Sequence, residues 1–457
     1  MYFTGTVYWI TRVMNVYGGL PIVTAVLVNA LLIGYLSLFT ALFATAVAQL
    51  SKVHGPRALL LSPFIWVATE LGRTYFLTGF PWVLLGYSQV TTLPVAQVAS
   101  LFGVYGVSAV VASVSAALAL AAVRSAAAPS GGGLPRALRS PAYRPLAATL
   151  VLLLAVSVWG ALRIRRGELT SVGEPVTVGL IQGNVPQSEK WDPRRGAEIF
   201  RDYLNMSRRA IGEGADLVVW PESATPFLFE EDRPAAEQIR MLARQAKADI
   251  LLGSDQIERG PAARYFNAAF LVRPDGTDGG VYRKMHLVPF GEYVPLKDIL
   301  FFAAPLVEAV SDFSAGEEAT LLPARGRQLS TAICYEIVYP NLVRQAVRGG
   351  SELLTTITTD AWFGPTSAPY QHFAQASMRA IENGRYLVRS ANTGISGIVD
   401  PYGRVLGQTA IFEQATLVGQ ARFVPVQTVY ARTGDLFAYG STLLTAVLLA
   451  ATRRRVK

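Results

Sequence analysis

The chain has 457 residues, of which 51% are hydrophobic and only 16% are charged, and its formal net charge is +9. A soluble protein usually carries about 25% charged residues, and the apolar excess lies before residue 163 and after residue 434. We therefore expect a membrane protein with one globular domain in the middle of the chain. No basic stripe interleaved with aromatic residues marks that middle region, so the positive charge does not indicate nucleic-acid binding.

Five segments are apolar enough to span a bilayer, for which about 20 consecutive residues are needed. They are residues 20–48, 58–78, 95–122, 146–162 and 434–451. The second segment is a weaker candidate for a span, because Glu70 and Arg73 lie near one end of it. Residues 1–17 are aromatic and moderately apolar but short, and we interpret them as part of a further span. A cleavable signal peptide is not expected, because no basic stretch precedes a short apolar core with a cleavage site.

The basic loops predict the orientation of these spans, because short cytoplasmic loops are enriched in Lys and Arg. Loops 49–57 and 123–145 and the tail after residue 451 carry basic residues and no acidic ones. Five spans put all three on one side, which we expect to be cytoplasmic, so the region between residues 163 and 433 faces outward. Three arginines directly after the fourth span would favour the opposite orientation: Arg163, Arg165 and Arg166. We give more weight to the two basic loops and the basic tail, which agree with one another.

In the middle of the chain, short β-branched runs alternate with helical stretches. Strands are predicted at 175–183, 215–223, 249–257, 265–274, 327–336, 352–360 and 386–400, and helices at 193–211, 233–247, 339–348 and 370–384. This alternation, followed by hairpin-like pairs, favours a layered α/β domain with buried sheets. The predicted domains are a transmembrane helical domain at 1–165, an extracytoplasmic α/β domain at 173–428, and a transmembrane helix with a basic cytoplasmic tail at 434–457.

Three polar residues stand where predicted strands end. Glu222 follows VVWP, Lys284 lies in VYRKMHLVPFGEYVP, and Cys334, the only cysteine, ends RQLSTAIC. Strand ends of α/β domains commonly present catalytic groups. A carboxylate can take the proton of a thiol nucleophile, and a lysine can stabilise the oxyanion that its attack creates. The three residues are therefore candidates for nucleophilic catalysis.

Plainer interpretations exist for each of them. A lone cysteine in a strand is more often an inert core residue, Glu222 could cap a helix, and Lys284 could be solvated. A cysteine–histidine mechanism is disfavoured, because there are only three histidines and His54 lies in a cytoplasmic loop. His372 could pair with Cys334, but its QHFAQA context is typical of a helix start. One cysteine and scattered histidines also give no metal-site pattern, and we expect no metal and no cofactor.

At these stretches the sequence resembles the nitrilase superfamily, whose Glu–Lys–Cys triad lies on an αββα sandwich. WPES, YRKMHLVPFGEYVP and AICYE resemble its glutamate, lysine and cysteine motifs, and TTDAWFG (358–364) resembles the stretch that follows. The motifs are separated by about 60 and about 50 residues in the expected order, which a single chance motif would not give. The resemblance implies an α/β fold, a nitrilase-like αββα sandwich inserted between transmembrane helices.

Together with the spans, the resemblance narrows to the apolipoprotein N-acyltransferase family. It extends to GFPWVLLGYSQ (79–89), GNVPQSEKWD (183–192) and YARTGD (430–435). Members usually carry eight spans, and the start of this chain corresponds to the third, so we expect the first two to be missing. The family setting implies a bacterial inner (cytoplasmic) membrane, with the catalytic domain facing the periplasm.

The resemblance also implies a reaction. A phospholipid is the acyl donor, Cys334 carries the acyl chain as a thioester, and the N-terminal amine of a diacylated apolipoprotein is the acceptor. Glu222 is the implied base, and Lys284, with a backbone N–H near Tyr335, the implied oxyanion donor. Four further residues match positions that the family uses around its site: Trp191, Glu292, Tyr335 and Glu336. Glu292 would hold Lys284 by charge pairing, whereas Tyr335 and Glu336 could equally determine the shape of the site.

Two apolar stretches are candidates for lipid contact. Residues 297–313 could form an arm that dips into the bilayer or a helix packed under a loop, and its apolar residues are Phe301, Phe302, Leu306 and Val307. Phe227, Leu228 and Phe229 could form a second mobile lip. Two rival functions stay open: a membrane-tethered amidase or nitrilase-type hydrolase that uses the same triad, and a non-catalytic membrane binding or transport protein.

Overall fold

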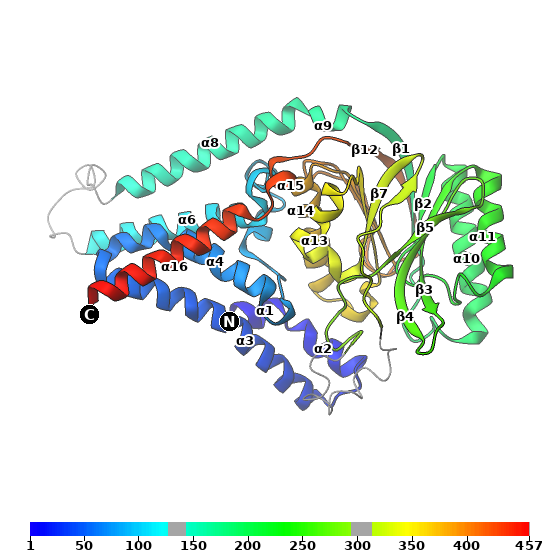
Figure 1. The fold of residues 1–457 in the computed structure, drawn as a ribbon, viewed down its shortest axis with the longest axis horizontal. Coiled ribbons are helices and arrows are strands. Elements are labelled where there is room, and N and C mark those ends of the chain that lie inside the picture. The colour runs from blue at the N-terminus through cyan, green and yellow to red at the C-terminus, as the bar shows by residue number, and fades with distance from the viewer. Residues whose placement is uncertain (127–142, 294–312, 457) are drawn as a thin grey trace. The chain divides into compact units, whose positions relative to one another are not determined.

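The computed structural model describes residues 1–126, 143–293 and 313–456, and the chain divides into two compact units. The first unit joins residues 1–30 to residues 168–427, and the second joins residues 31–167 to residues 428–457. Figure 1 labels the helices and strands of both.

Two six-stranded sheets form the centre of the first unit, in the orders β12-β1-β2-β3-β4-β5 and β11-β10-β9-β8-β7-β6. The strands of the first sheet are β1 (Glu174–Gln182), β2 (Leu217–Val219), β3 (Asp249–Glu258), β4 (Arg264–Val272), β5 (Asp278–Arg283) and β12 (Ala415–Phe423). Those of the second are β6 (Leu322–Ala324), β7 (Arg327–Ile333), β8 (Leu353–Thr358), β9 (Leu387–Ala391), β10 (Gly397–Val399) and β11 (Val405–Gln408).

Each sheet has three parallel strands at its centre and antiparallel strands outside them. Strands β1, β2 and β3 are parallel in the first sheet, and β7, β8 and β9 are parallel in the second. Parallel strands end at the same edge of a sheet, so the residues that follow β7, β8 and β9 are neighbours. This arrangement collects side chains that are far apart in the sequence.

Aliphatic residues fill the space between the sheets, and helices cover their outer faces. Val178, Leu217 and Leu251 of the first sheet share one buried cluster with Ile333 and Ile357 of the second. Helices α10 (Pro193–Gly212) and α11 (Arg233–Ala246) pack on the first sheet, and α13 (Pro340–Arg348) and α14 (Ala368–Asn383) pack on the second (Figure 1). The helix–sheet–sheet–helix order confirms the predicted αββα sandwich.

Local signals explain where the helices begin. In α10, Asp192 caps the first turn by accepting the backbone N–H of Arg194, with Pro193 at the first helical position, where its missing N–H costs nothing. One prediction was wrong in detail. The run 386–400, expected as one strand, forms β9 and the antiparallel β10 with a turn between them.

Four helical stretches among the described residues are long and apolar enough to cross a membrane. They are Ile22–Thr78, Ala99–Ala126, Arg144–Ser171 and Leu436–Arg454. The first consists of α3 (Ile22–His54), a 3-10 turn, α4 (Ser62–Tyr75) and a second short turn, and it contains most of the first two predicted spans. The second stretch is α6 (Ala99–Ala126), the third is α8 (Arg144–Arg166) extended by α9 (Glu168–Ser171), and the fourth is α16 (Leu436–Val456). These three overlap the third, fourth and fifth predicted spans, respectively.

The charged pair on α4 is buried rather than lipid-exposed. Glu70 accepts the backbone N–H of Leu85 at 2.6 Å, and Arg73 donates to the backbone oxygen of Trp82 at 2.9 Å. Both side chains thus satisfy main-chain groups of the 79–89 stretch, which removes most of the cost of placing them in an apolar setting.

The first sheet meets the loop after β2 at a glycine. A Cβ on Gly253 would lie 2.4 Å from the oxygen of Pro221 and 2.8 Å from the Cα of Glu222. We expect Gly253→Ala to displace this loop and to cost about 1–3 kcal/mol of stability by overpacking. Thermal unfolding of the purified protein should show a lower midpoint. Gly212→Ala, at the end of α10 with nothing within 4 Å, is the matched control and should unfold no earlier than the parent. Equal midpoints for both variants would contradict this account of the loop.

Candidate active site

Glu222 is buried and held by two fixed donors. Its side chain lies in the loop after β2, with 5% of the residue exposed. One carboxylate oxygen, Oε1, accepts from the side-chain amide of Asn267 at 2.7 Å, and the other, Oε2, accepts from the backbone N–H of Thr359 at 2.8 Å. The donors come from β4 and from the residue after β8, so both sheets fix this carboxylate.

Lys284 follows β5 and lies between two carboxylates. Its Nζ is 2.8 Å from Oε1 of Glu292 and 3.5 Å from Oε1 of Glu222. The Asn267 amide, which binds Glu222, also donates to Oε1 of Glu292 at 3.1 Å. Lys284 and Asn267 therefore both bridge the two carboxylates, Lys284 by ion pairs and Asn267 by hydrogen bonds, in a closed ring.

The charges around Lys284 keep it protonated. Only 1% of the residue is exposed, and burial alone would lower the pKa of its ammonium group. The negative charges of Glu292 and Glu222 outweigh burial, so the pKa of Lys284 lies above its ordinary value. At neutral pH this side chain is an ammonium donor inside a site that is largely closed to water.

Cys334 is the first residue after β7 and adopts an unusual backbone conformation. Its φ is +54°, in the left-handed region that non-glycine residues rarely adopt. The residue is 8% exposed. Burial and the nearby Glu222 carboxylate raise the pKa of the thiol well above its usual range, although Lys284 and a hydrogen bond from Thr358 act in the opposite direction. The resting group is therefore a neutral thiol.

Glu336 joins the cysteine segment to the lysine segment. One of its oxygens accepts from the Tyr282 hydroxyl and from the backbone N–H groups of Met285 and His286, at 2.7 to 3.1 Å. The other accepts from the backbone N–H of Ile333 at 2.7 Å. Burial raises the pKa of this carboxyl to about 7, while these donors and Lys284 oppose the rise. The hydrogen bonds of Glu336 thus connect the segment that contains Cys334 to the segment that contains Lys284.

The structure places the remaining two candidates less centrally. Trp191 is 48% exposed, and its ring lies 5.9 Å from the ammonium of Lys190. Tyr335 is buried against the rings of Tyr339 and His286, and its hydroxyl accepts from that of Tyr339 at 3.1 Å. Of the seven predicted site residues, Glu222, Lys284 and Glu292 are joined by ion pairs, and Cys334 and Glu336 lie within electrostatic range of Lys284.

Sequence reasoning missed two charged neighbours of the site. Lys190 is buried and donates to the backbone oxygen of Glu222 at 3.4 Å. Burial lowers its pKa, while the charges of Asp255 and Glu222 oppose this. Asp255 accepts from Ser223 at 2.8 Å, and burial raises its pKa. Lys190 lies within the GNVPQSEKWD stretch, which could have drawn attention to it.

Two family models match this chain. Residues 177–430 match the carbon-nitrogen hydrolase model, and residues 1–117 match the apolipoprotein N-acyltransferase N-terminal domain. The apolipoprotein N-acyltransferase of Geobacter metallireducens is 41% identical over 455 residues, covering 99% of this chain and 85% of that protein. The chain belongs to the apolipoprotein N-acyltransferase family. The family predicted from the sequence motifs is confirmed.

A second relative and a solved structure also match this chain. The apolipoprotein N-acyltransferase of Methylococcus capsulatus is 35% identical over 457 residues, covering 98% of this chain and 85% of that protein. Among solved structures, a Nesterenkonia amidase from the nitrilase superfamily has a TM-score of 0.42 at 23% identity, covering 58% of this chain and 96% of that chain.

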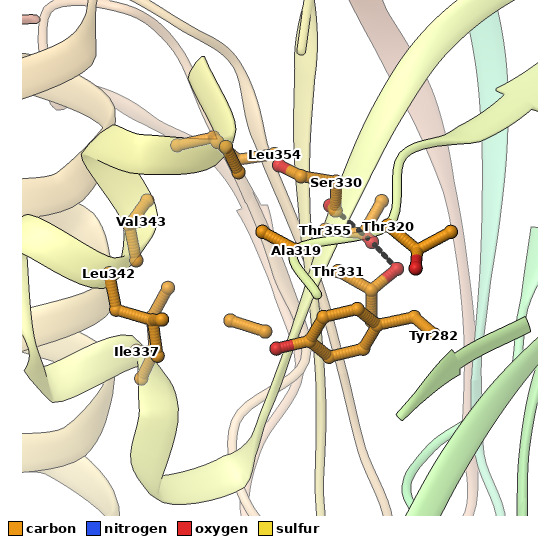
Figure 2. Close-up of a pocket in the computed structure, with 12 residues that line it drawn as sticks. Tyr282, Ala319, Thr320, Ser330, Thr331, Ile337, Leu342, Val343, Leu354 and Thr355 are labelled. Atoms are coloured by element: carbon orange, nitrogen blue, oxygen red, sulfur yellow. Dashed lines mark hydrogen bonds between the residues drawn. The ribbon is translucent and has the colours of Figure 1, made fainter. Parts of the chain in front are cut away.

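A small cavity in this protein lies between the second sheet and α13. Figure 2 shows its lining, which includes Thr331 and Thr355, hydrogen-bonded to each other at 2.9 Å, and Tyr282. Its volume of about 20 Å³ is enough for roughly one water molecule. None of Glu222, Lys284 and Cys334 lines it, so we do not assign it to an acyl chain.

The structure bears on one of the two predicted lipid contacts. Residues 297–312 of the predicted arm lie outside the described residues. In the other stretch, Phe229 is fully buried against Phe270, and the ring of Phe227 packs on Phe200 at 4.9 Å. The prediction of a mobile lip was wrong for Phe229, because its ring belongs to the buried core under α10 and α11. Phe227 is half-buried and packs against that core, and for it the lip stays a prediction.

Asn267 offers a test of the ring of donors around Glu222. Asn267→Leu keeps a similar volume but removes both amide bonds to carboxylates, and a hydrogen bond to a charged group is worth about 1.5–3 kcal/mol. We expect slower acylation of Cys334 by phospholipid, measured by mass spectrometry of the intact protein. Asn205→Leu, at an exposed position of α10, is the control and should react normally. Parental rates in Asn267→Leu would reduce Asn267 to a packing residue.

Proposed function

We propose that this chain transfers a fatty acyl chain from a membrane phospholipid to the N-terminal amine of diacylglyceryl-cysteine in an apolipoprotein. The single observation that carries the proposal is the buried cluster of Glu222, Lys284 and Cys334 in a member of this family. A nucleophile, a base and an oxyanion donor are the groups that acyl transfer requires.

In the first half of the reaction, Sγ of Cys334 attacks the ester carbonyl carbon of the phospholipid. The thiol proton passes to the Glu222 carboxylate as the carbon–sulfur bond forms, and the Lys284 ammonium stabilises the oxyanion. The carbon–oxygen bond then breaks, Glu222 returns the proton to the leaving oxygen, and a lysophospholipid departs. A thioester on Cys334 remains.

In the second half, the neutral amine of the apolipoprotein attacks the thioester carbonyl carbon. Glu222 takes a proton from the attacking nitrogen, and Lys284 again stabilises the oxyanion. The carbon–sulfur bond breaks, and the proton held by Glu222 restores the thiol of Cys334. One amide bond is formed for each ester bond consumed, and the enzyme returns to its starting state.

The supporting residues have separate proposed roles. Glu292 holds the Lys284 ammonium, and Glu336 holds the cysteine and lysine segments in register through its four accepted hydrogen bonds. Tyr335 shapes the site through its packing on Tyr339. Trp191 is proposed to contact substrate, because its ring is large, apolar and half exposed.

The apolar helices and the family suggest a bacterial membrane protein. We propose further that this is the inner membrane and that the catalytic domain faces the periplasm, supported by the basic residues of loops 49–57 and 123–145 and of the tail. A hydrolase with the same triad and a non-catalytic membrane protein were the rival hypotheses. The match to acyltransferases over nearly the whole chain favours neither.

The first test concerns the nucleophile. After mixing with phosphatidylethanolamine vesicles, the parent protein should gain the mass of one acyl chain on the Cys334 peptide. Cys334→Ala should gain none while still entering the membrane. Cys334→Ser should also react poorly, because a hydroxyl is far less acidic than a thiol and a carboxylate is too weak a base for it. An acylated Cys334→Ala protein would exclude the mechanism.

The second test concerns the acceptor, which separates transfer from hydrolysis. The acyl-enzyme should persist with phospholipid alone and should discharge when a diacylated lipopeptide with a free N-terminal amine is added. An N-acetylated lipopeptide is the matched control and should leave the thioester intact. Release of free fatty acid at one rate, with or without acceptor, would identify a hydrolase.

A further inference from the structure

A second buried polar cluster lies behind the nucleophile. His372 of α14, Asp360 after β8 and Arg389 of β9 are all fully buried. The His372 Nε2 is 3.1 Å from the backbone oxygen of Cys334, and Nδ1 is 3.0 Å from Oδ1 of Asp360. Arg389 Nη2 is 2.9 Å from Oδ2 of Asp360 and 3.1 Å from Nδ1 of His372.

The hydrogen-bonding chemistry of this cluster fixes where the imidazole proton lies. A carbonyl oxygen only accepts, so Nε2 of His372 must carry a proton and donate it to Cys334. The two hydrogens of Arg389 Nη2 then serve Oδ2 of Asp360 and Nδ1 of a neutral imidazole. If His372 were protonated, Nδ1 would instead donate to Asp360. Nε2 donates to the Cys334 carbonyl in both states.

This contact acts on backbone that is otherwise unfavourable. Cys334 has φ +54°, and a non-glycine residue in the left-handed region costs about 1–3 kcal/mol unless its surroundings hold it there. The surroundings in this case include the His372 bond to its carbonyl. Packing holds Asp360 in turn, since a Cβ on Gly394 would lie 2.0 Å from its Oδ2.

We propose that His372, oriented by Arg389 and Asp360, is a positioning residue for the nucleophile: it holds the Cys334 carbonyl and with it the backbone conformation that presents the thiol. The proposal rests on the proposed function of Cys334. It differs from the cysteine–histidine pairing considered from the sequence, because the imidazole contacts the main-chain oxygen of Cys334 and not its thiol. His372 therefore takes no proton from the reaction.

Two amide substitutions separate this role from a merely structural one. In His372→Gln the amide nitrogen can occupy the place of Nε2 and donate to Cys334. In His372→Asn the shorter amide can reach only the place of Nδ1, near Asp360 and Arg389. We expect acylation to fall about 10- to 100-fold in His372→Asn and to stay within about threefold of the parent in His372→Gln, because small displacements of a reacting group have effects of this size. The loss should appear in kcat, with KM for phospholipid unchanged.

The measurements are acylation by phosphatidylethanolamine vesicles, alkylation of Cys334 by iodoacetamide, and the thermal midpoint. The protein has a single cysteine, so alkylation reports one thiol without any lipid. It should slow in His372→Asn as acylation does. Ser377→Ala, which removes a hydroxyl bonded within α14, is the control for disturbance of that helix and should behave as the parent. His372→Met fills a similar length without an N–H donor and replaces the Asn variant if that protein does not fold.

Equal rates in the Gln and Asn variants, or a Gln variant slower than Asn, would overturn the proposal. So would a result in which Gln folds while Asn and Met do not, since the N–H would then serve the fold. The failure of the proposed function is a separate result: Cys334→Ala would still transfer acyl chains, whatever the His372 variants do.

Discussion

The site depends on one buried cation shared by two buried carboxylates. A lysine taken out of water loses several kcal/mol of hydration, and Lys284 is compensated by Glu292 at 2.8 Å and Glu222 at 3.5 Å. The carboxylates are themselves like charges, and their oxygens tolerate each other because Lys284 is ion-paired with both and Asn267 donates to both. Removing any member leaves an uncompensated group in the core. This ring of donors and acceptors therefore fixes the geometry of the proposed base and of the proposed oxyanion donor at once.

Burial and the nearby charges determine how the thiol can react. Burial raises the pKa of the Cys334 thiol, and the negative charge of Glu222 raises it further, although the ammonium of Lys284 opposes them. A preformed thiolate is disfavoured in this setting, in contrast to cysteines activated beside a cationic histidine or a helix N-terminus. In the proposed reaction the proton therefore leaves as the bond to carbon forms, and a general base is needed at that moment. Glu222, whose position is fixed by both sheets, is suited to that role.

Candidate site residues could be recognised from the sequence where they stand at strand ends, and less readily where they lie within strands. Glu222, Lys284 and Cys334 could be found because each was judged to stand at a strand end, and Glu292 and Glu336 because they belong to the same motifs. Asn267 is in the middle of β4, where a polar residue has no distinctive context, and it meets Glu222 only because β4 lies next to β3. Trp191 was chosen from its motif, whereas the residue of that motif that is buried against Glu222 is Lys190.

The cluster of Asp360, His372 and Arg389, which reaches Cys334 through His372, was beyond sequence reasoning for a different reason. It arises from the parallel order of β7, β8 and β9, which brings three strand ends to one edge, and no single segment reveals that order. From the sequence, His372 was interpreted only as part of a helix start. Its hydrogen bond to the main chain of Cys334 has no sequence signal. The turn between β9 and β10 was missed as well, although Asn392 and Gly394 between the two strands are of the residue types that favour turns.

Burial of the triad also bears on the choice between amine and water as the second nucleophile. The triad is the same for transfer and for hydrolysis, so the outcome depends on which molecule reaches the thioester. With Glu222, Lys284 and Cys334 at 5%, 1% and 8% exposure, few waters can approach along the path that the base controls. An amine delivered on a bound lipopeptide gains the advantage of proximity, whereas an occasional water must first be oriented by the same carboxylate. The buried ring around Lys284 thus favours a reaction in which the acceptor is itself a bound substrate.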